Sequence, residues 1–252
     1  MGVTAENIAE KYKISRKEQD LFALDSQQKT EKTVKENKFK DELITFEIKK
    51  NDKIETFKKD EYPRENLSIE KLKSLKTIFK DNGTVTAGNS SGLNDGAAVL
   101  VLMSREEAEL RSIEPLVKII SWATCGVEPS LMGLGPIPAT NLALKKAGWQ
   151  ISHVDLFEIN EAFAAQVLAV LKALEEPRYA RLAGLVDPLG PFPRAHLNQR
   201  GGAIALGHPV GATGARLILS ALNQLKATNG KRALVSLCIG GGQGAAIWLE
   251  RH

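Results

Sequence analysis

The chain has 252 residues and a mass of 27.4 kDa, and 43% of its residues are hydrophobic and 25% charged. This length suits one large domain or two small ones, with a core that needs no disulfide or metal staple. A net charge of +4 is too small for a nucleic-acid footprint, and no apolar run approaches the roughly 18 residues of a membrane span. The start lacks a signal-peptide core, and two cysteines, Cys125 and Cys238, make neither a disulfide framework nor a zinc site. We therefore expect a cytoplasmic protein with no metal, no nucleic acid and no membrane among its partners.

Residues 1–80 differ in composition from the rest of the chain. They hold 19 of the 34 basic residues, 16 of the 30 acidic residues and one of the 21 glycines. Ser15 and Glu18 have the capping-box spacing, and a helical pattern of apolar residues follows through Leu21, Phe22 and Leu24 to Val34. The pattern predicts a solvated helical subdomain. A disordered charged segment is disfavoured, because the region carries too many large apolar residues.

From Gly83 onward, short apolar runs alternate with amphipathic stretches, which is typical of an α/β fold. Strands are expected at 97–103, 117–122, 154–159 and 233–237. Helices are expected to begin at Ser104 and to cover 139–147, 163–171 and 215–225, and 177–193 reads as a loop.

Asn160 follows a predicted strand and precedes a predicted helix, at an edge of the sheet where ligands gather in open α/β folds. Spacing alone favours a helix N-cap for Asn160, and a functional asparagine would instead orient a water or an oxyanion. Glu161 is most simply a partner of the helix macrodipole.

His208 and Cys238 also lie beside glycine-rich turns. His208 stands within a string of five glycines over 201–214. In so flexible a turn, a functional role for His208 is favoured as much as that of an ordinary hydrogen-bonded histidine. Cys238 closes a strand and is either a small buried hydrophobe or a reactive thiol. Backbone N–H groups of the following turn, which includes Gly240 and Gly241, are candidates to stabilise a thiolate or an oxyanion. Cys125 has no such setting and reads as structural.

Three blocks of sequence together resemble the later active-site blocks of the thiolases. They are Asn-Glu-Ala-Phe-Ala at 160–164, Gly-His-Pro at 207–209 and Cys-Ile-Gly-Gly-Gly-Gln-Gly at 238–244. They occur in the family order and at family-like intervals. The resemblance extends through 133–138 and 88–98 back to 1–7, so it covers essentially the whole chain.

The resemblance implies a role for each candidate residue in Claisen chemistry between acyl-CoA units. Cys238 corresponds to the base that removes the α-proton, which requires the glycine-rich turn to hold its pKa near the working pH. His208 corresponds to the histidine that activates the nucleophile and donates to the thioester oxygen, and Asn160 to the residue that holds an oxyanion-site water. Ser91 corresponds to a serine on the pantetheine arm. Arg64 corresponds to an arginine near the adenine, with a solvated surface arginine as the alternative.

The resemblance also implies a domain plan. Residues 1–90 correspond to part of the loop domain that covers CoA, 91–114 to a returning strand and helix of the N-terminal thiolase domain, and 115–252 to the layered αβα-type C-terminal domain. The N-terminal half with its acylated cysteine is expected to be absent. We therefore expect an acetyl-CoA acetyltransferase or 3-ketoacyl-CoA thiolase that is inactive alone, with CoA thioesters as substrates and no separate cofactor. A homo-oligomer or a complementing N-terminal half is the expected partner, and a non-catalytic CoA-binding or scaffold protein is the alternative.

Overall fold

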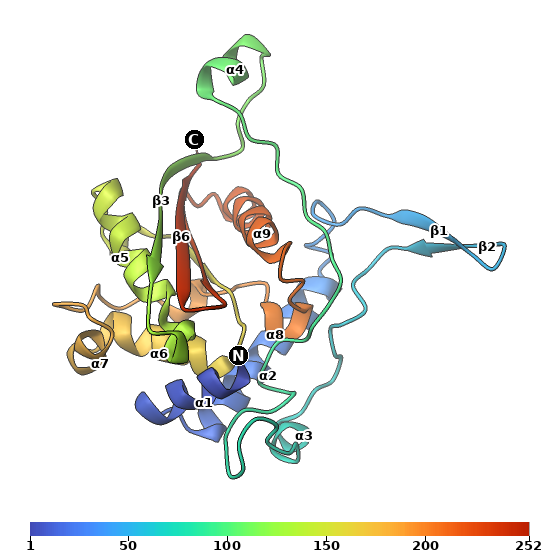
Figure 1. The fold of residues 1–252 in the computed structure, drawn as a ribbon. Coiled ribbons are helices and arrows are strands. Elements are labelled where there is room, and N and C mark those ends of the chain that lie inside the picture. The colour runs from blue at the N-terminus through green and yellow to red at the C-terminus, as the bar shows by residue number, and fades with distance from the viewer. Residues whose placement is uncertain (252) are drawn as a thin grey trace.

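The computed structural model describes residues 1–251 (Figure 1). Its helices are α1 (Gly2–Lys11), α2 (Arg16–Lys35), α3 (Ile69–Lys73), α4 (Arg105–Leu110), α5 (Pro136–Ala147), α6 (Ala164–Glu175), α7 (Pro177–Leu182), α8 (Ala203–Leu206) and α9 (Thr213–Thr228). Its strands are β1 (Phe46–Lys50), β2 (Lys53–Phe57), β3 (Lys118–Gly126), β4 (Leu156–Ile159), β5 (Arg232–Ile239) and β6 (Gln243–Glu250). Three short 3₁₀ turns lie at Pro129–Leu134, Ile151–His153 and Arg194–His196.

The N-terminal region is built around the long helix α2. Ser15 and Glu18 form the complete capping box that their spacing predicts. The buried face of α2 is unusual, because all but one of its members are polar: Gln19, Asp20, Ala23, Ser26, Gln27, Thr30 and Thr33. Buried polar groups require hydrogen-bond partners, and Ser26, Gln27 and Thr30 find theirs in the C-terminal region.

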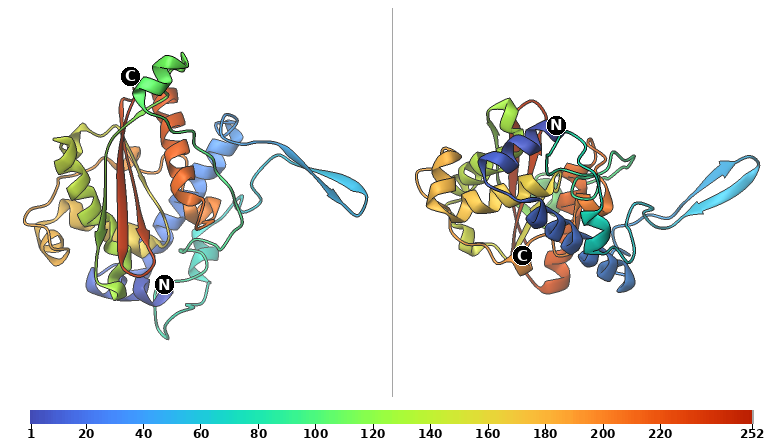
Figure 2. Two further views of the ribbon diagram at one scale, coloured as in Figure 1. Left: turned by 45° about the horizontal axis from the view of Figure 1, so that its top comes forward. Right: turned by 90° about the horizontal axis from the view of Figure 1, so that it is seen from below.

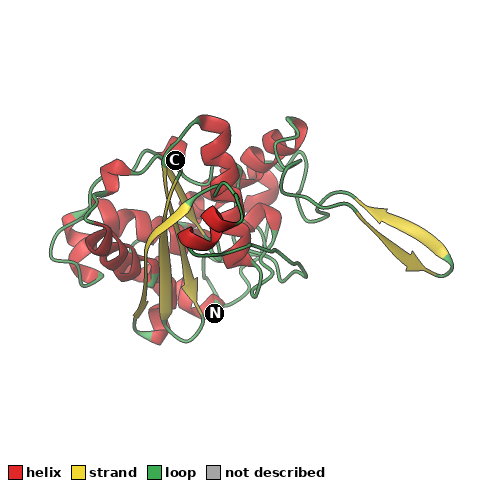
Figure 3. Ribbon diagram, turned by 90° about the horizontal axis from the view of Figure 1, so that it is seen from above, coloured by secondary structure: helices red, strands yellow, loops and turns green. Residues whose placement is uncertain are grey.

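The hairpin β1–β2 was not predicted from the sequence, which indicated only helices in this region. It projects away from the body of the molecule (Figure 3). Phe46 pairs with Phe57 at its base, and their rings stack 5.8 Å apart.

The C-terminal region is a three-layer α/β structure, as the sequence predicts. The sheet has the order β3-β6-β5-β4, in which β4 and β5 are parallel and the other pairs antiparallel. Helix α9 packs on one face through Leu217, Ala221 and Leu225, and α5 and α6 pack on the opposite face around Trp248 and Phe157 (Figures 1 and 2). The expected strand at 154–159 and helices at 139–147, 163–171 and 215–225 are present with shifted ends.

Two predicted elements are wrong. Residues 177–193 contain α7 at their start, where Pro177 occupies the first helical position and so costs no hydrogen bond. Residues 97–103 are extended but lie in no sheet, and Val99, Val101 and Leu102 are 78%, 82% and 70% exposed. A strand that is apolar on both faces needs a neighbour on each edge and a layer on each face, and none of residues 1–251 supplies them.

No helix among residues 1–251 combines the length and the apolar character that crossing a bilayer requires.

Candidate active site

Asn160 and Cys238 meet at one end of the central sheet. Ile159, the last residue of β4, pairs with Ser236 of β5, and the N–H of Asn160 donates to the Ser236 carbonyl at 2.9 Å. Asn160 therefore lies beside the end of β5 that carries Cys238. It is fully buried and is not a helix cap, because α6 begins only at Ala164. The N-cap interpretation of Asn160 is thus wrong.

His208 contacts Asn160 through one ring nitrogen and Thr213 through the other. Nε2 lies 3.3 Å from the Asn160 side-chain nitrogen, and Nδ1 lies 2.7 Å from the hydroxyl oxygen of Thr213. The Thr213 hydroxyl donates to the Pro209 carbonyl at 2.9 Å, so its oxygen is left to accept from Nδ1–H. This arrangement assigns the Nδ1–H tautomer and leaves the Nε2 lone pair facing Asn160. Burial lowers the pKa of His208, with a smaller effect from the Arg216 charge, so the ring is neutral near pH 7.

Thr213 was not singled out from the sequence. Its position five residues after His208, in the first turn of α9, is the only signal, and it becomes interpretable once the turn is folded. Asn160 retains one further feature of interest: its Oδ1 is buried and accepts no bond from residues 1–251. A buried acceptor of this kind suits a donor such as water.

Cys238 is the penultimate residue of β5 and is 7% exposed, in an apolar cluster with Ala162, Phe163 and Met132. Burial raises the pKa of its thiol to about 12. The expectation that the glycine-rich turn holds this pKa near the working pH is therefore wrong for this arrangement, in which Cys238 is a neutral thiol. Gly240 and Gly241 lie at the exposed tip of the β5–β6 hairpin.

Ser91 lies close to this cluster, whereas Arg64 does not. The backbone N–H and the hydroxyl of Ser91 both donate to the Ala162 carbonyl, at 3.0 and 3.1 Å. The Ser91 hydroxyl is partly exposed and keeps lone pairs free to accept. Arg64 lines a separate groove of about 400 Å³, whose lining includes the basic residues Lys35, Lys40, Lys58 and Lys59 and also Leu206, the last residue of α8.

Cys125 is remote from the other candidates. It pairs with Gly244 of β6, and Gly244 pairs with Cys238 on the other side. Two strand spacings, about 10 Å, therefore separate the Cα atoms of the two cysteines. Cys125 is half-buried, and burial raises its pKa. The charge of Lys146 opposes this rise without reversing it.

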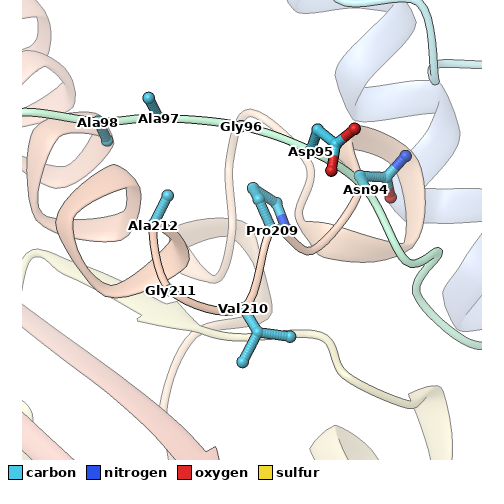
Figure 4. Close-up of a pocket in the computed structure, with 9 residues that line it drawn as sticks. All are labelled: Asn94, Asp95, Gly96, Ala97, Ala98, Pro209, Val210, Gly211 and Ala212. Atoms are coloured by element: carbon cyan, nitrogen blue, oxygen red, sulfur yellow. The ribbon is translucent and has the colours of Figure 1, made fainter.

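The outer side of the His208 turn borders an open pocket of about 390 Å³ (Figure 4). One wall is the extended segment 94–98, and the other is Pro209–Ala212. The Asn94 side chain accepts a bond from the His208 N–H at 3.3 Å, so it ties the extended segment to the turn.

Comparison with known proteins decides the family. A model of the thiolase C-terminal domain matches residues 113–251, and a model of the thiolase N-terminal domain matches residues 1–106. The chain belongs to the thiolase family. An acetyl-CoA acetyltransferase of Shinella zoogloeoides is 48% identical to it over 99% of this chain and 60% of that protein.

Solved thiolases share the fold. The acetyl-CoA acetyltransferase of Bacillus anthracis superposes with a TM-score of 0.91 at 43% identity, covering all of this chain and 60% of that one. Human mitochondrial 3-ketoacyl-CoA thiolase in complex with CoA gives 0.84 at 38% identity, covering 100% and 59%. This thiolase-family chain thus spans about 60% of the length of these relatives.

One expectation about the domain plan needs correction. The N-terminal thiolase half was expected to be absent, yet the N-terminal domain model matches residues 1–106. The match extends the N-terminal domain back over residues 1–90, which the resemblance assigns to the loop domain, whereas 91–114 is already expected in the N-terminal domain. The boundaries at 90 and 114 stay predictions.

Proposed function

We propose that this thiolase-family chain takes part in thiolase-type acyl transfer between coenzyme A thioesters, either acetyl-CoA acetyltransfer or 3-ketoacyl-CoA thiolysis. The observation that carries the proposal is the bond between Asn160 and His208 at the sheet edge where the buried thiol of Cys238 lies. One neutral histidine, one amide with a free buried oxygen and one thiol form a set suited to moving a proton at carbon and holding an oxyanion.

In the thiolysis direction, the bond between C2 and C3 of a 3-ketoacyl-CoA breaks after a cysteine thiolate attacks C3. The acyl group passes to that cysteine, and the electron pair stays on C2 of the departing acetyl-CoA. Cys238 supplies the proton to C2 from its S–H. Its pKa of about 12 supports this role, because the thiol is fully protonated at neutral pH. In the condensation direction the same sulfur removes that proton as a thiolate, a step that requires the assembled, substrate-bound site to lower the thiol pKa below the value of about 12.

His208 and Asn160 serve the other reacting groups. The Nε2 lone pair of His208, once released from the Asn160 amide, accepts the proton of the attacking thiol, and the resulting Nε2–H donates to the thioester oxygen. Thr213 keeps the ring oriented throughout by accepting from Nδ1–H. A water that donates to Oδ1 of Asn160 completes the oxyanion site with the histidine.

The coenzyme A part of the substrate is assigned to the N-terminal region. Ser91 lies one hydrogen bond from Ala162 and offers free lone pairs to an amide N–H of the pantetheine arm. Arg64 and the four lysines of its groove offer cationic groups to the phosphates, although the same lining carries four acidic residues, Glu31, Asp60, Glu61 and Glu65. The human 3-ketoacyl-CoA thiolase structure in complex with CoA supports this ligand class. No separate cofactor is needed, because the thioester is itself the activated group.

The acyl-accepting cysteine is assigned to another polypeptide segment, because Cys125 lies two strands away from Cys238 with a raised pKa. The exposed apolar segment 97–103 supports this assignment, because it is extended, unpaired and apolar on both faces. A β-sheet edge of a complementing thiolase N-terminal fragment would satisfy its backbone groups and cover its side chains. In the absence of that fragment, the same segment promotes self-association of the chain.

The test is a thiolysis assay that follows loss of acetoacetyl-CoA with CoA present, for the chain alone and mixed with a separately expressed thiolase N-terminal fragment. We expect turnover in the mixture that is lost in Cys238→Ala and His208→Ala and retained in Cys125→Ala. Turnover by the chain alone would refute the assignment of the nucleophile. Silence in every mixture, with CoA binding retained in calorimetry, would favour the non-catalytic CoA-binding alternative.

A further inference from the structure

Glu161 is a buried carboxylate that the reaction outlined above does not use. It is 1% exposed and lies three residues before the start of α6, so its interpretation as a helix-dipole partner is wrong. Its Oε2 accepts from the Ser26 hydroxyl at 2.6 Å and from the N–H of Ile204 at 3.3 Å, and its Oε1 accepts from the Asn198 amide at 2.8 Å. Helix α2, the segment before the glycine string and helix α8 therefore all converge on this one carboxylate.

Asn198 connects this carboxylate to the end of β4. Its Oδ1 accepts from the N–H of Ile159 and its amide nitrogen donates to the carbonyl of Ile159, both at 2.9 Å. The side-chain amide of Asn198 therefore bonds to β4 as the backbone of a neighbouring strand would. It fixes the position of Ile159, the residue immediately before Asn160. Its left-handed backbone, with φ of +43°, is tolerated by asparagine better than by most residues.

The other two bonds fix the approach to His208. The N–H of Ile204 belongs to the four-residue helix α8, which is followed directly by Gly207 and His208. A Cβ atom on Gly202 would lie 2.3 Å from the Glu161 carboxyl carbon, so the backbone of the glycine string is pressed against the carboxylate. Ser26 in turn donates to Glu161 and accepts from the N–H of Gly202 at 3.1 Å.

We propose that Glu161 is a positioning residue that sets the spacing between Asn160 and His208. The two side chains reside on separate segments, and each segment is held to the same carboxylate through one or two hydrogen bonds. The inference rests on the proposed thiolase function for its catalytic consequence, while its structural part stands on the contacts alone. Burial raises the pKa of Glu161, and the three donors that face it oppose this rise, so the ionised carboxyl that accepts from all three suits the role.

An amide at this position cannot satisfy the three donors. If the NH₂ of glutamine replaces Oε1, it faces the NH₂ of Asn198, which cannot flip without losing both of its bonds to Ile159. If it replaces Oε2, the hydroxyl of Ser26 can rotate to accept, but the N–H of Ile204 loses its acceptor. In either orientation one of the two segments, that of Asn198 or that of Ile204, loses its hydrogen bond to residue 161. The distance between Asn160 and His208 is then less well fixed.

The test compares Glu161→Gln with Glu158→Gln as a matched control. Glu158 is also fully buried two residues before Asn160, but among residues 1–251 only one of its oxygens has a partner, Gln224, so an amide fits there. The first readout is the ¹⁵N chemical shift of His208 Nε2 in the labelled chain, which needs no activity. The second is kcat and KM for thiolysis in the mixture with the N-terminal fragment.

We expect Glu161→Gln to move the His208 Nε2 shift and to lower kcat by ~10-fold or more with KM within about 3-fold, the size of one lost buried hydrogen bond. Glu158→Gln is expected to leave both the His208 Nε2 shift and kcat unchanged. An unchanged His208 shift in Glu161→Gln, or an equal change in the control, would overturn the proposal. If Glu161→Gln does not fold, Ser26→Ala removes one donor and is expected to move the shift in the same direction, and no movement would refute the role. If the wild-type mixture is silent, the proposed function fails while the shift still decides the positioning role.

Discussion

The buried carboxyl of Glu158 makes stability depend on pH in a direction that can be measured. Its Oε1 accepts from the Gln224 amide at 2.8 Å, while its Oε2 is buried and has no partner among residues 1–251. Burial is the main cause that raises its pKa from 4.5 to about 7. The folded state therefore holds this proton more tightly than the unfolded state does.

The sign and the size of the effect follow from proton linkage. Below pH 4.5 both states are protonated, and the group contributes no difference. Between pH 4.5 and about pH 7 the unfolded state loses its proton first, so stability falls as the pH rises, and above pH 7 the loss is constant. A shift of this size corresponds to about 3 kcal/mol.

Glu158→Gln removes this penalty, because the amide carries no charge and can donate to the unpartnered Oε1 of Gln224. We expect the free energy of unfolding of the variant, measured with urea, to rise relative to wild type by about 3 kcal/mol between pH 4.5 and pH 8, with the gain complete by pH 8. The two proteins should be nearly equal in the acid limit. A difference in free energy of unfolding between variant and wild type that stays constant across this pH range would show that Glu158 is ionised in the folded state at pH 5. That result would refute the reasoning.

Three further predictions follow from single contacts. Thr213→Val removes the acceptor for Nδ1–H of His208 and should lower kcat in the complemented thiolysis assay about tenfold, whereas Thr213→Ser should stay near wild type; equal rates would argue against a role in orienting the ring. Gly201 and Gly184 have similar φ angles of +80° and +78°, but a Cβ would meet a side chain of α2 at 1.9 Å only at Gly201. Gly184→Ala should cost about 1 kcal/mol in urea unfolding and Gly201→Ala roughly 1–3 kcal/mol more, and equal costs would show that the collision is relieved. Val101→Lys should reduce self-association in light scattering and lower exposed-hydrophobe dye binding; a wild-type chain that is a clean monomer without dye binding would contradict this expectation.

Local signals in the sequence were sufficient for much of the fold. The capping box at Ser15, the α/β alternation and the positions of Asn160 and Cys238 at strand ends all depend on neighbours in sequence or on the period of a strand or helix. These are the features for which local pattern and final structure agree.

The errors concern residues whose role is set by contacts distant in sequence. Glu161 reads locally as a helix-start acid, yet its partner Ser26 is 135 residues away. The high pKa of Cys238 comes from the apolar side chains that cover it, which include Met132, more than 100 residues upstream. The segment 97–103 has the pattern of a central strand, but a central strand forms only when a neighbouring strand pairs with each of its two edges.

The central claim is that the sulfur of Cys238 carries the proton to and from the α-carbon of a CoA thioester. The most direct measurement is the loss of label from methyl-trideuterated acetyl-CoA in ordinary water, with the N-terminal fragment present. We predict that wild type and Cys125→Ala wash the deuterium out at similar rates, and that Cys238→Ala does not. Washout at the wild-type rate in Cys238→Ala would show that another group moves the proton and would contradict the account.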